Sequence, residues 1–178
     1  MEESSNSLAD LESLVGIFFP KLEQLGDFEA VDAIDVPEPQ NSLLNHNHHM
    51  TVTVEKFHSS PVDVEVLNST SHASEYSREI LLRRSSDRGI VQYGIVRLHF
   101  EFLSEQVRTE IQKRQTPLGR ILISHNVMRQ VKLLSLYKIR PGERLAEFFG
   151  PEKLCFGRTA LIYCDDQPAI ELLEIITA

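Results

Sequence analysis

Several features that would assign a function directly are missing from this 178-residue sequence. Its two cysteines, Cys155 and Cys164, have no CxxC spacing, which is typical of reduced, partly buried residues in a cytoplasmic protein. The longest apolar run, residues 14–19, is far too short to cross a bilayer, so we expect no membrane insertion. Met1 is followed by acidic and polar residues rather than by the basic segment of a signal peptide.

The common catalytic motifs are missing too. The sequence has no phosphate-binding Walker loop, no dinucleotide fingerprint, no nucleophile triad and no internal repeat. A net charge of −8 argues against a protein held on nucleic acid or on an anionic membrane by charge. A small anionic ligand stays possible, because the local charge of a site decides its binding.

The length and composition fit one globular domain. We expect a helical extension and connector over residues 1–40, with a polar, frayed start at 1–9, and a main domain over 41–178. Helical patterns lie at residues 9–19, with a continuation over 22–28, and at 42–46, 104–114, 116–125 and 144–149. Alternating patterns predict strands at 50–55, 62–66, 75–83, 90–102, 131–139, 156–163 and 169–176. With a polar loop at 68–74 and a hairpin turn at 85–89, the chain predicts an α+β fold with an antiparallel sheet of about six or seven strands.

One helix start looks suited to an anion. Thr116 fits the N-cap position and Pro117 the first helical turn, which leaves the N–H groups of Leu118 and Gly119 free. Such groups suit a carboxylate or a phosphate, and Gly119 permits a close approach to the backbone. An ordinary proline-started helix after a loop is the alternative.

Charged residues also occur on apolar strand faces. Arg78 shares a face with Tyr76, Ile80 and Leu82, and because a guanidinium stays charged, a buried Arg78 needs an anionic partner. Glu174 shares a face with Ile170, Leu172 and Ile176, whereas Glu171 lies on the opposite face. Arg78 either pairs with Glu174 or Glu171, or shares a ligand carboxylate with the Leu118 amide while Glu174 faces the other end of that ligand.

Other polar residues give weaker signals. The cluster His46–His49 lacks a second group of metal ligands, so we expect no metal. His125 follows the Leu118 helix and either approaches the site or ends the helix. Arg158 either adds positive charge to a site or pairs with one of the two glutamates.

The order of these motifs resembles that of the chorismate pyruvate-lyases, particularly the branch found in cyanobacteria and plastids. The motifs are His49-Met-Thr51, Arg78-Glu-Ile-Leu-Leu82, Thr116-Pro-Leu-Gly-Arg120, Gly157-Arg158, and Gln167-Pro168 followed by Glu174. The resemblance covers roughly residues 42–178 and is strongest over 117–129.

The resemblance implies an α+β domain in which helical flaps cover an enclosed ligand. The activity it implies is a carbon–oxygen lyase that cleaves chorismate to 4-hydroxybenzoate and pyruvate without metal or organic cofactor. Arg78 and the backbone amides of Met50 and Leu118 would bind the ring carboxylate, and Glu174 would lie at the hydroxyl end. The product would lead to a quinone such as plastoquinone, and a monomer is favoured.

Two departures from the family pattern stand out. His48-His49 replaces a small turn before Met50, and Ile95 stands where the bacterial ubiquinone-pathway enzymes carry an arginine. Because the match of Glu174 requires a one-residue shift, Glu171 is kept as an alternative. Competing interpretations are a non-catalytic aromatic acid sensor of the same fold, and an interaction protein with a structural Arg78–Glu174 pair.

Overall fold

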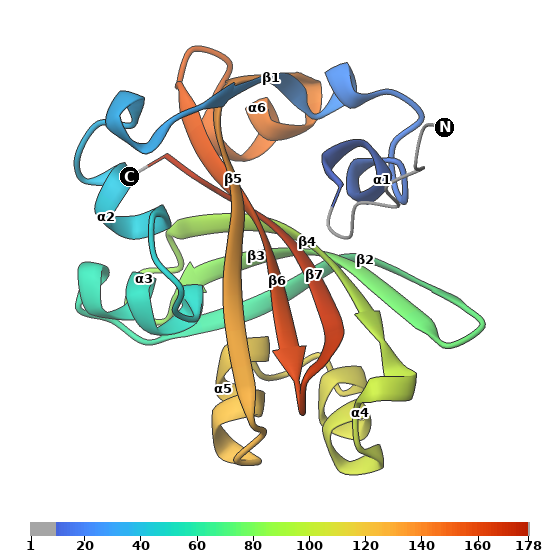
Figure 1. Ribbon diagram of the computed structural model, residues 1–178. Coiled ribbons are helices and arrows are strands. Elements are labelled where there is room, and N and C mark those ends of the chain that lie inside the picture. The colour runs from blue at the N-terminus through green and yellow to red at the C-terminus, as the bar shows by residue number, and fades with distance from the viewer. Residues whose placement is uncertain (1–9, 178) are drawn as a thin grey trace.

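A seven-stranded antiparallel sheet dominates the computed structural model, which describes residues 10–177 (Figure 1). The predicted frayed stretch at 1–9 lies outside the described residues. The strand order is β1-β5-β6-β7-β4-β3-β2. The strands are β1 (Gly26–Val31), β2 (Val62–His72), β3 (Glu75–Arg84), β4 (Ile90–His99), β5 (Arg129–Pro141), β6 (Cys155–Cys164) and β7 (Gln167–Ile176).

Helices cover both faces of this sheet. They are α1 (Leu11–Val15), α2 (Gln40–Leu44), α3 (Met50–His58), α4 (Glu105–Gln112), α5 (Leu118–Ser124) and α6 (Glu143–Phe149), with three short 3-10 turns at Leu22–Gln24, Ala33–Asp35 and Phe100–Phe102. Buried side chains of α1 and α6 join a core on one sheet face, and those of α2 to α5 join two cores on the other. The α+β prediction with an antiparallel sheet is confirmed. None of the helices in residues 10–177 is long and apolar enough to span a membrane.

The alternating patterns locate most strands correctly. Strands β3, β5, β6 and β7 lie where they are predicted, and the hairpin turn at 85–89 joins β3 to β4. Helix α4 begins as expected, since the Ser104 side chain accepts a hydrogen bond from the Val107 N–H and Val107 and Ile111 are buried. The predicted strand 90–102 is three residues shorter, because Phe100–Phe102 forms a 3-10 turn.

The strand predicted at 50–55 is wrong, because these residues form helix α3. Met50 and Val54 are buried four residues apart, which is the spacing of one helix face, whereas Val52 is 49% exposed. A run of six residues fits both periodicities, and the packing of Met50 and Val54 under the sheet decides between them.

The two sheet edges also differ from the prediction. The loop predicted at 68–74 is the second half of β2, which pairs with β3 up to His72 opposite Glu75. Residues 22–28, predicted to continue a helix, contain a 3-10 turn and the start of β1, which pairs with β5. Both strands are edge strands with one unpaired side, so polar residues face solvent there and weaken the apolar alternation. Residues within the 1–40 segment therefore contribute to the same sheet as residues 41–178.

Candidate functional site

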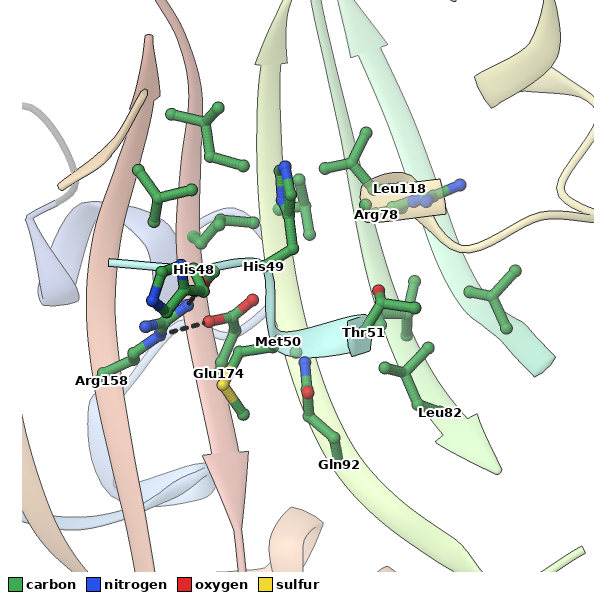
Figure 2. A pocket seen from close by; sticks show the side chains of 18 residues that line it. His48, His49, Met50, Thr51, Arg78, Leu82, Gln92, Leu118, Arg158 and Glu174 are labelled. Atoms are coloured by element: carbon green, nitrogen blue, oxygen red, sulfur yellow. Dashed lines mark hydrogen bonds and ion pairs between the residues drawn. The ribbon is translucent and has the colours of Figure 1, made fainter. Parts of the chain in front are cut away.

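A pocket lies between the sheet and the starts of helices α3 and α5, and encloses about 530 Å³ of space free of protein atoms, part of it open to solvent. Arg78, Met50, Leu118 and Glu174, the four residues predicted for the site, all line it (Figure 2). Helices α3 and α5 contribute to its cover, and strands β3, β4, β6 and β7 contribute to its floor. Residues that lie far apart in the sequence therefore meet in one pocket.

Strand register fixes the position of each polar group on the floor. Gly94 of β4 lies opposite Ile80 of β3 and opposite Glu174 of β7, and Glu174 lies opposite Arg158 of β6. Arg78 lies two residues before Ile80, on the same face of the sheet. Because Gly94 has no side chain, the floor between Ile80 and Glu174 stays open.

Arg78 is the most unusual group in the pocket. Its side chain is 1% exposed. Among the described residues, 10–177, its one hydrogen bond is a 3.4 Å contact from Nη1 to the Ile111 carbonyl, and Nε has no partner. Burial lowers the pKa of Arg78 from its ordinary value, and the charge of Arg114 lowers it further. No ion pair joins Arg78 to a carboxylate within residues 10–177, so the alternative of a pair with Glu174 or Glu171 is wrong.

The first residues of two helices line the same pocket as this guanidinium. Met50 begins α3 and Leu118 begins α5, so their backbone N–H groups have no acceptor within their own helices. Thr116 was predicted as the N-cap of α5, but Pro117 occupies that position, because its extended backbone precedes the first helical residue. The predicted free amide of Leu118 is unaffected by this shift.

Gly119 allows the two helix starts to touch. A Cβ atom at Gly119 would lie 3.0 Å from Thr51 Oγ1 and 3.1 Å from His49 Cβ. The sequence predicted that Gly119 permits a close approach to the backbone, and the group that approaches is the start of α3. This contact brings the Met50 and Leu118 amides to the same side of the pocket.

Glu174 is paired, but with Arg158. Glu174 Oε2 accepts a 2.7 Å hydrogen bond from Arg158 Nε, and the Arg158 side chain is completely buried (Figure 2). Arg158 also donates to the carbonyls of Leu44, His46 and His48 at 2.8 to 3.2 Å. It thus joins the acidic residue of the pocket to residues 45–49, the segment between α2 and α3 that we call the strap.

Glu171 belongs to the other face of the sheet. Its carboxylate accepts two hydrogen bonds from Arg97, at 2.7 and 2.8 Å, and contacts His99 Nε2 at 2.7 Å. It does not line the pocket. Of the two glutamates considered from the sequence, Glu174 is the one that faces the site.

Two histidines of the strap, His46 and His49, are neutral at pH 7. Burial lowers the pKa of His46 to about 4, helped by the charge of Arg158, and burial together with Arg129 and Arg158 lowers the pKa of His49 to about 4. His49 Nε2 accepts a 2.7 Å hydrogen bond from Arg129 Nε at the surface. Within residues 10–177, no group of three or more histidine, cysteine or acidic side chains is arranged to hold a metal ion.

Two other expectations concern residues near the site. His125 is the C-cap of α5 and does not line the pocket, in agreement with its alternative role at the helix end. Ile95 is buried in the core on the other side of the sheet, one residue away from Gly94 on the pocket floor.

Gln92 is a pocket residue that the sequence-based reasoning missed. It lines the pocket, is 3% exposed, and its Oε1 atom has no hydrogen-bond partner in the described part of the chain (Figure 2). The signal was present, because Gln92 occupies an even position of a strand whose even positions Val96 and Leu98 face a core. A polar residue at such a position resembles the case of Arg78.

No protein-family profile and no curated protein matches the sequence. Among solved structures, the chain is similar to the crystal structure of PhnF from Mycobacterium smegmatis, with a TM-score of 0.49 and 12% sequence identity. The alignment covers 72% of this chain and 63% of the PhnF chain, so the chain spans less than two thirds of that protein's length. A functional conclusion therefore depends on the pocket itself.

Proposed function

We propose that the protein has a chorismate lyase-like fold and is a chorismate pyruvate-lyase, which converts chorismate to 4-hydroxybenzoate and pyruvate. The observation that carries the proposal is the buried Arg78, which lines the pocket without a protein carboxylate to neutralise it. A buried guanidinium is costly unless an anion binds it, and a small carboxylic acid would fit this need. The ordered motifs shared with the lyase family select chorismate among such acids.

The ring carboxylate would be bound at the Arg78 end of the pocket. The guanidinium would donate to one side of the carboxylate, and the backbone N–H groups of Met50 and Leu118 would donate to the other. Charge-assisted hydrogen bonds of this kind are short and strong, and they hold the ring in one orientation. Holding chorismate in one conformer supplies part of the catalysis, because the substrate gains aromaticity when it reacts.

Glu174 would act at the opposite end of the ring. In the reaction, the ether bond at ring carbon 3 breaks, the hydrogen on ring carbon 4 leaves as a proton, and the enolpyruvyl methylene gains a proton to give pyruvate. The Glu174 carboxylate would accept a hydrogen bond from the hydroxyl at carbon 4 and stabilise positive charge that develops on the ring. Arg158 would hold this carboxylate in position.

The same proposal includes the setting of the reaction. The enzyme would act as a cytoplasmic monomer without metal or organic cofactor, on a small-molecule substrate rather than on nucleic acid. The 4-hydroxybenzoate released would lead to a quinone such as plastoquinone.

A second candidate is a sensor domain that binds 4-hydroxybenzoate or a related acid without turnover. The Glu174–Arg158 pair favours it, because the Glu174 oxygen that Arg158 contacts at 2.7 Å already has a partner within the protein. A third interpretation, an interaction protein stabilised by an Arg78–Glu174 pair, loses its basis because Arg78 makes no such pair.

Two measurements separate the candidates. Incubation with chorismate should release 4-hydroxybenzoate and pyruvate in equal amounts if the protein is a lyase. Calorimetric titration with 4-hydroxybenzoate should give binding for both the lyase and the sensor. Binding without product would support the sensor, and the absence of both binding and product would rule out both functions.

A further inference from the structure

Two buried polar atoms that line the pocket lack a hydrogen-bond partner within residues 10–177. One is Arg78 Nε and the other is Gln92 Oε1. In the proposed function, the ring carboxylate of the ligand is the partner of Arg78. Gln92 Oε1 has no partner in that proposal. A buried amide oxygen without a donor destabilises the folded protein, so its retention in a pocket points to a ligand group.

The strand register places these atoms toward opposite ends of the pocket. Arg78 and Leu82 are four residues apart on β3, about 13 Å in an extended strand, and Gln92 of β4 lies opposite Leu82. Glu174 lies opposite Gly94, two residues along the same strand from Gln92. Figure 2 shows Arg78 beside Leu118 and well apart from Gln92, with Glu174 beside Met50. The cationic group, the acidic group and the amide therefore follow one another along the floor.

We propose that Gln92 is a specificity-determining residue, which binds the ring substituent para to the ligand carboxylate together with Glu174. The inference rests on the proposed function, because it takes the carboxylate of the ring acid to be bound at Arg78. Gln92 and Glu174 are diagonal neighbours on adjacent strands, a separation of about 7–8 Å between which long side chains can share one ligand group. The residue of β4 that lies opposite Glu174 is Gly94, so β4 itself places no side chain between Gln92 and Glu174.

The chemistry of the two groups defines the substituent. An ionised carboxylate only accepts hydrogen bonds, whereas an amide both donates and accepts. A para hydroxyl that donates its proton to Glu174 accepts from Gln92 Nε2 once the amide turns. A para amino group has two N–H bonds, one for Glu174 and one for Gln92 Oε1. The pocket therefore selects ring acids with a hydroxyl or an amino group para to the carboxylate.

A ligand without such a group is rejected because it leaves both side chains buried and unsatisfied. Benzoate fills the Arg78 end equally well but offers hydrogen in place of the para substituent. Sites built around buried polar groups discriminate strongly against ligands that lack the matching group. Gln92 and Glu174 each contribute part of the affinity difference between the para-substituted acids and benzoate.

Calorimetric titration of the full chain with 4-hydroxybenzoate, 4-aminobenzoate and benzoate tests this role. The wild type should bind both para-substituted acids at least tenfold more tightly than benzoate. Gln92→Met, which keeps the side-chain volume, should weaken both para-substituted acids roughly tenfold and leave benzoate within twofold. Gln92→Leu should give the same pattern and serves as the second variant.

Leu82→Met is the matched control, because Leu82 lies opposite Gln92 in the same pocket and is equally buried at 3% exposure. It should change the three affinities by a common factor, so that their ratios stay at the wild-type values. If the Gln92 variants weaken all three acids equally, or none, the specificity role is overturned while the proposed function stands. If the wild type binds none of the three acids, the proposed function fails, and the inference fails with it.

Discussion

Arg78 and Arg158 are both fully buried, but they differ in how well their guanidinium groups are hydrogen-bonded. Arg158 is satisfied by Glu174 and three carbonyls, whereas Arg78 has one long hydrogen bond and no carboxylate. Removing a buried charge that has a partner leaves that partner unpaired and destabilises the protein. Removing a buried charge without a partner removes the desolvation penalty of that charge and stabilises the protein. The two residues should therefore respond to the same substitution in opposite directions.

Arg78→Met should stabilise the protein and abolish ligand binding. We expect the free energy of unfolding to rise by about 1–3 kcal/mol, because an unpaired buried cation is replaced by an apolar side chain. The affinity for 4-hydroxybenzoate should fall roughly 100-fold or more, since its carboxylate loses a buried charged donor. Urea unfolding and calorimetry measure the two effects, with Arg83→Met on the same strand as control. A less stable variant that still binds the acid would contradict the assigned role of Arg78.

Arg158→Met should have the opposite effect on stability. It leaves Glu174 and the carbonyls of Leu44, His46 and His48 without their donor, so we expect a loss of about 3–5 kcal/mol in the free energy of unfolding. A double-mutant cycle with Glu174→Gln in urea measures the coupling between the pair. Additive effects of the two substitutions would show that the pair is not coupled.

The unusual residues could be identified from the sequence, but their partners could not. Arg78 and Glu174 stand out because they occupy apolar faces of alternating strands. Which arginine lies opposite Glu174 depends on the register between β6 and β7, and alternation within one strand does not contain that information. Because the sequence does not contain the register, it also suggested an ion pair between Arg78 and a glutamate that Arg78 does not contact.

The strap and the two helix starts form the cover of the pocket. Residues 45–49 are held from the sheet by Arg158 and from the surface by the contact between Arg129 and His49. The sequence predicted the start of α5 to within one residue, because proline and glycine restrict the local backbone. It did not predict α3, since a run of six residues fits both periods and only contacts distant in sequence select the helix.

The strap should loosen as the pH falls. The pKa values of His46 and His49 are about 4 in the folded protein and near 6.5 in the unfolded chain, so the unfolded chain binds more protons between these values. Their contribution to stability is complete above about pH 6.5 and is lost as the pH falls through about 4. Urea unfolding between pH 7 and 4 should show this decline, accompanied by faster amide exchange in residues 45–49.

Replacing both histidines supplies the control for this pH dependence. The double variant His46→Gln and His49→Gln should show a smaller loss of stability over the same range, because the two imidazoles with a pKa lowered to about 4 have been removed. An identical decline in the wild type and in the double variant would exclude the histidines as its source.

At the scale of the whole molecule, the sheet separates a structural face from a functional face. One face carries α1, α6 and the Glu171–Arg97 pair, and the other carries the pocket with Arg78 and Glu174. Side chains alternate between the two faces along β7, so Glu171 and Glu174, which are three residues apart, lie on opposite faces of the sheet. Sequence patterns were sufficient to predict this two-sided sheet, whereas edge strand β1 and the second half of edge strand β2, which bury one side only weakly, were missed.

Ligand binding should stabilise the whole chain by mass action. At a concentration 100 times its dissociation constant, 4-hydroxybenzoate should add about 2.7 kcal/mol to the free energy of unfolding. For a chain of this size, the melting temperature should rise by roughly 5–10 °C. Calorimetric melting with benzoate at the same concentration is the control, and an equal shift with both acids would contradict selective recognition at the para position.

Turnover of chorismate tests the central claim most directly. Purified protein is mixed with chorismate, and 4-hydroxybenzoate and pyruvate are quantified against protein-free and Arg78→Met samples. We expect equal amounts of the two products, formed at a rate proportional to protein concentration and lost in the variant. Product formation no faster than in the protein-free sample would contradict the assignment as a lyase, whether or not the protein binds 4-hydroxybenzoate.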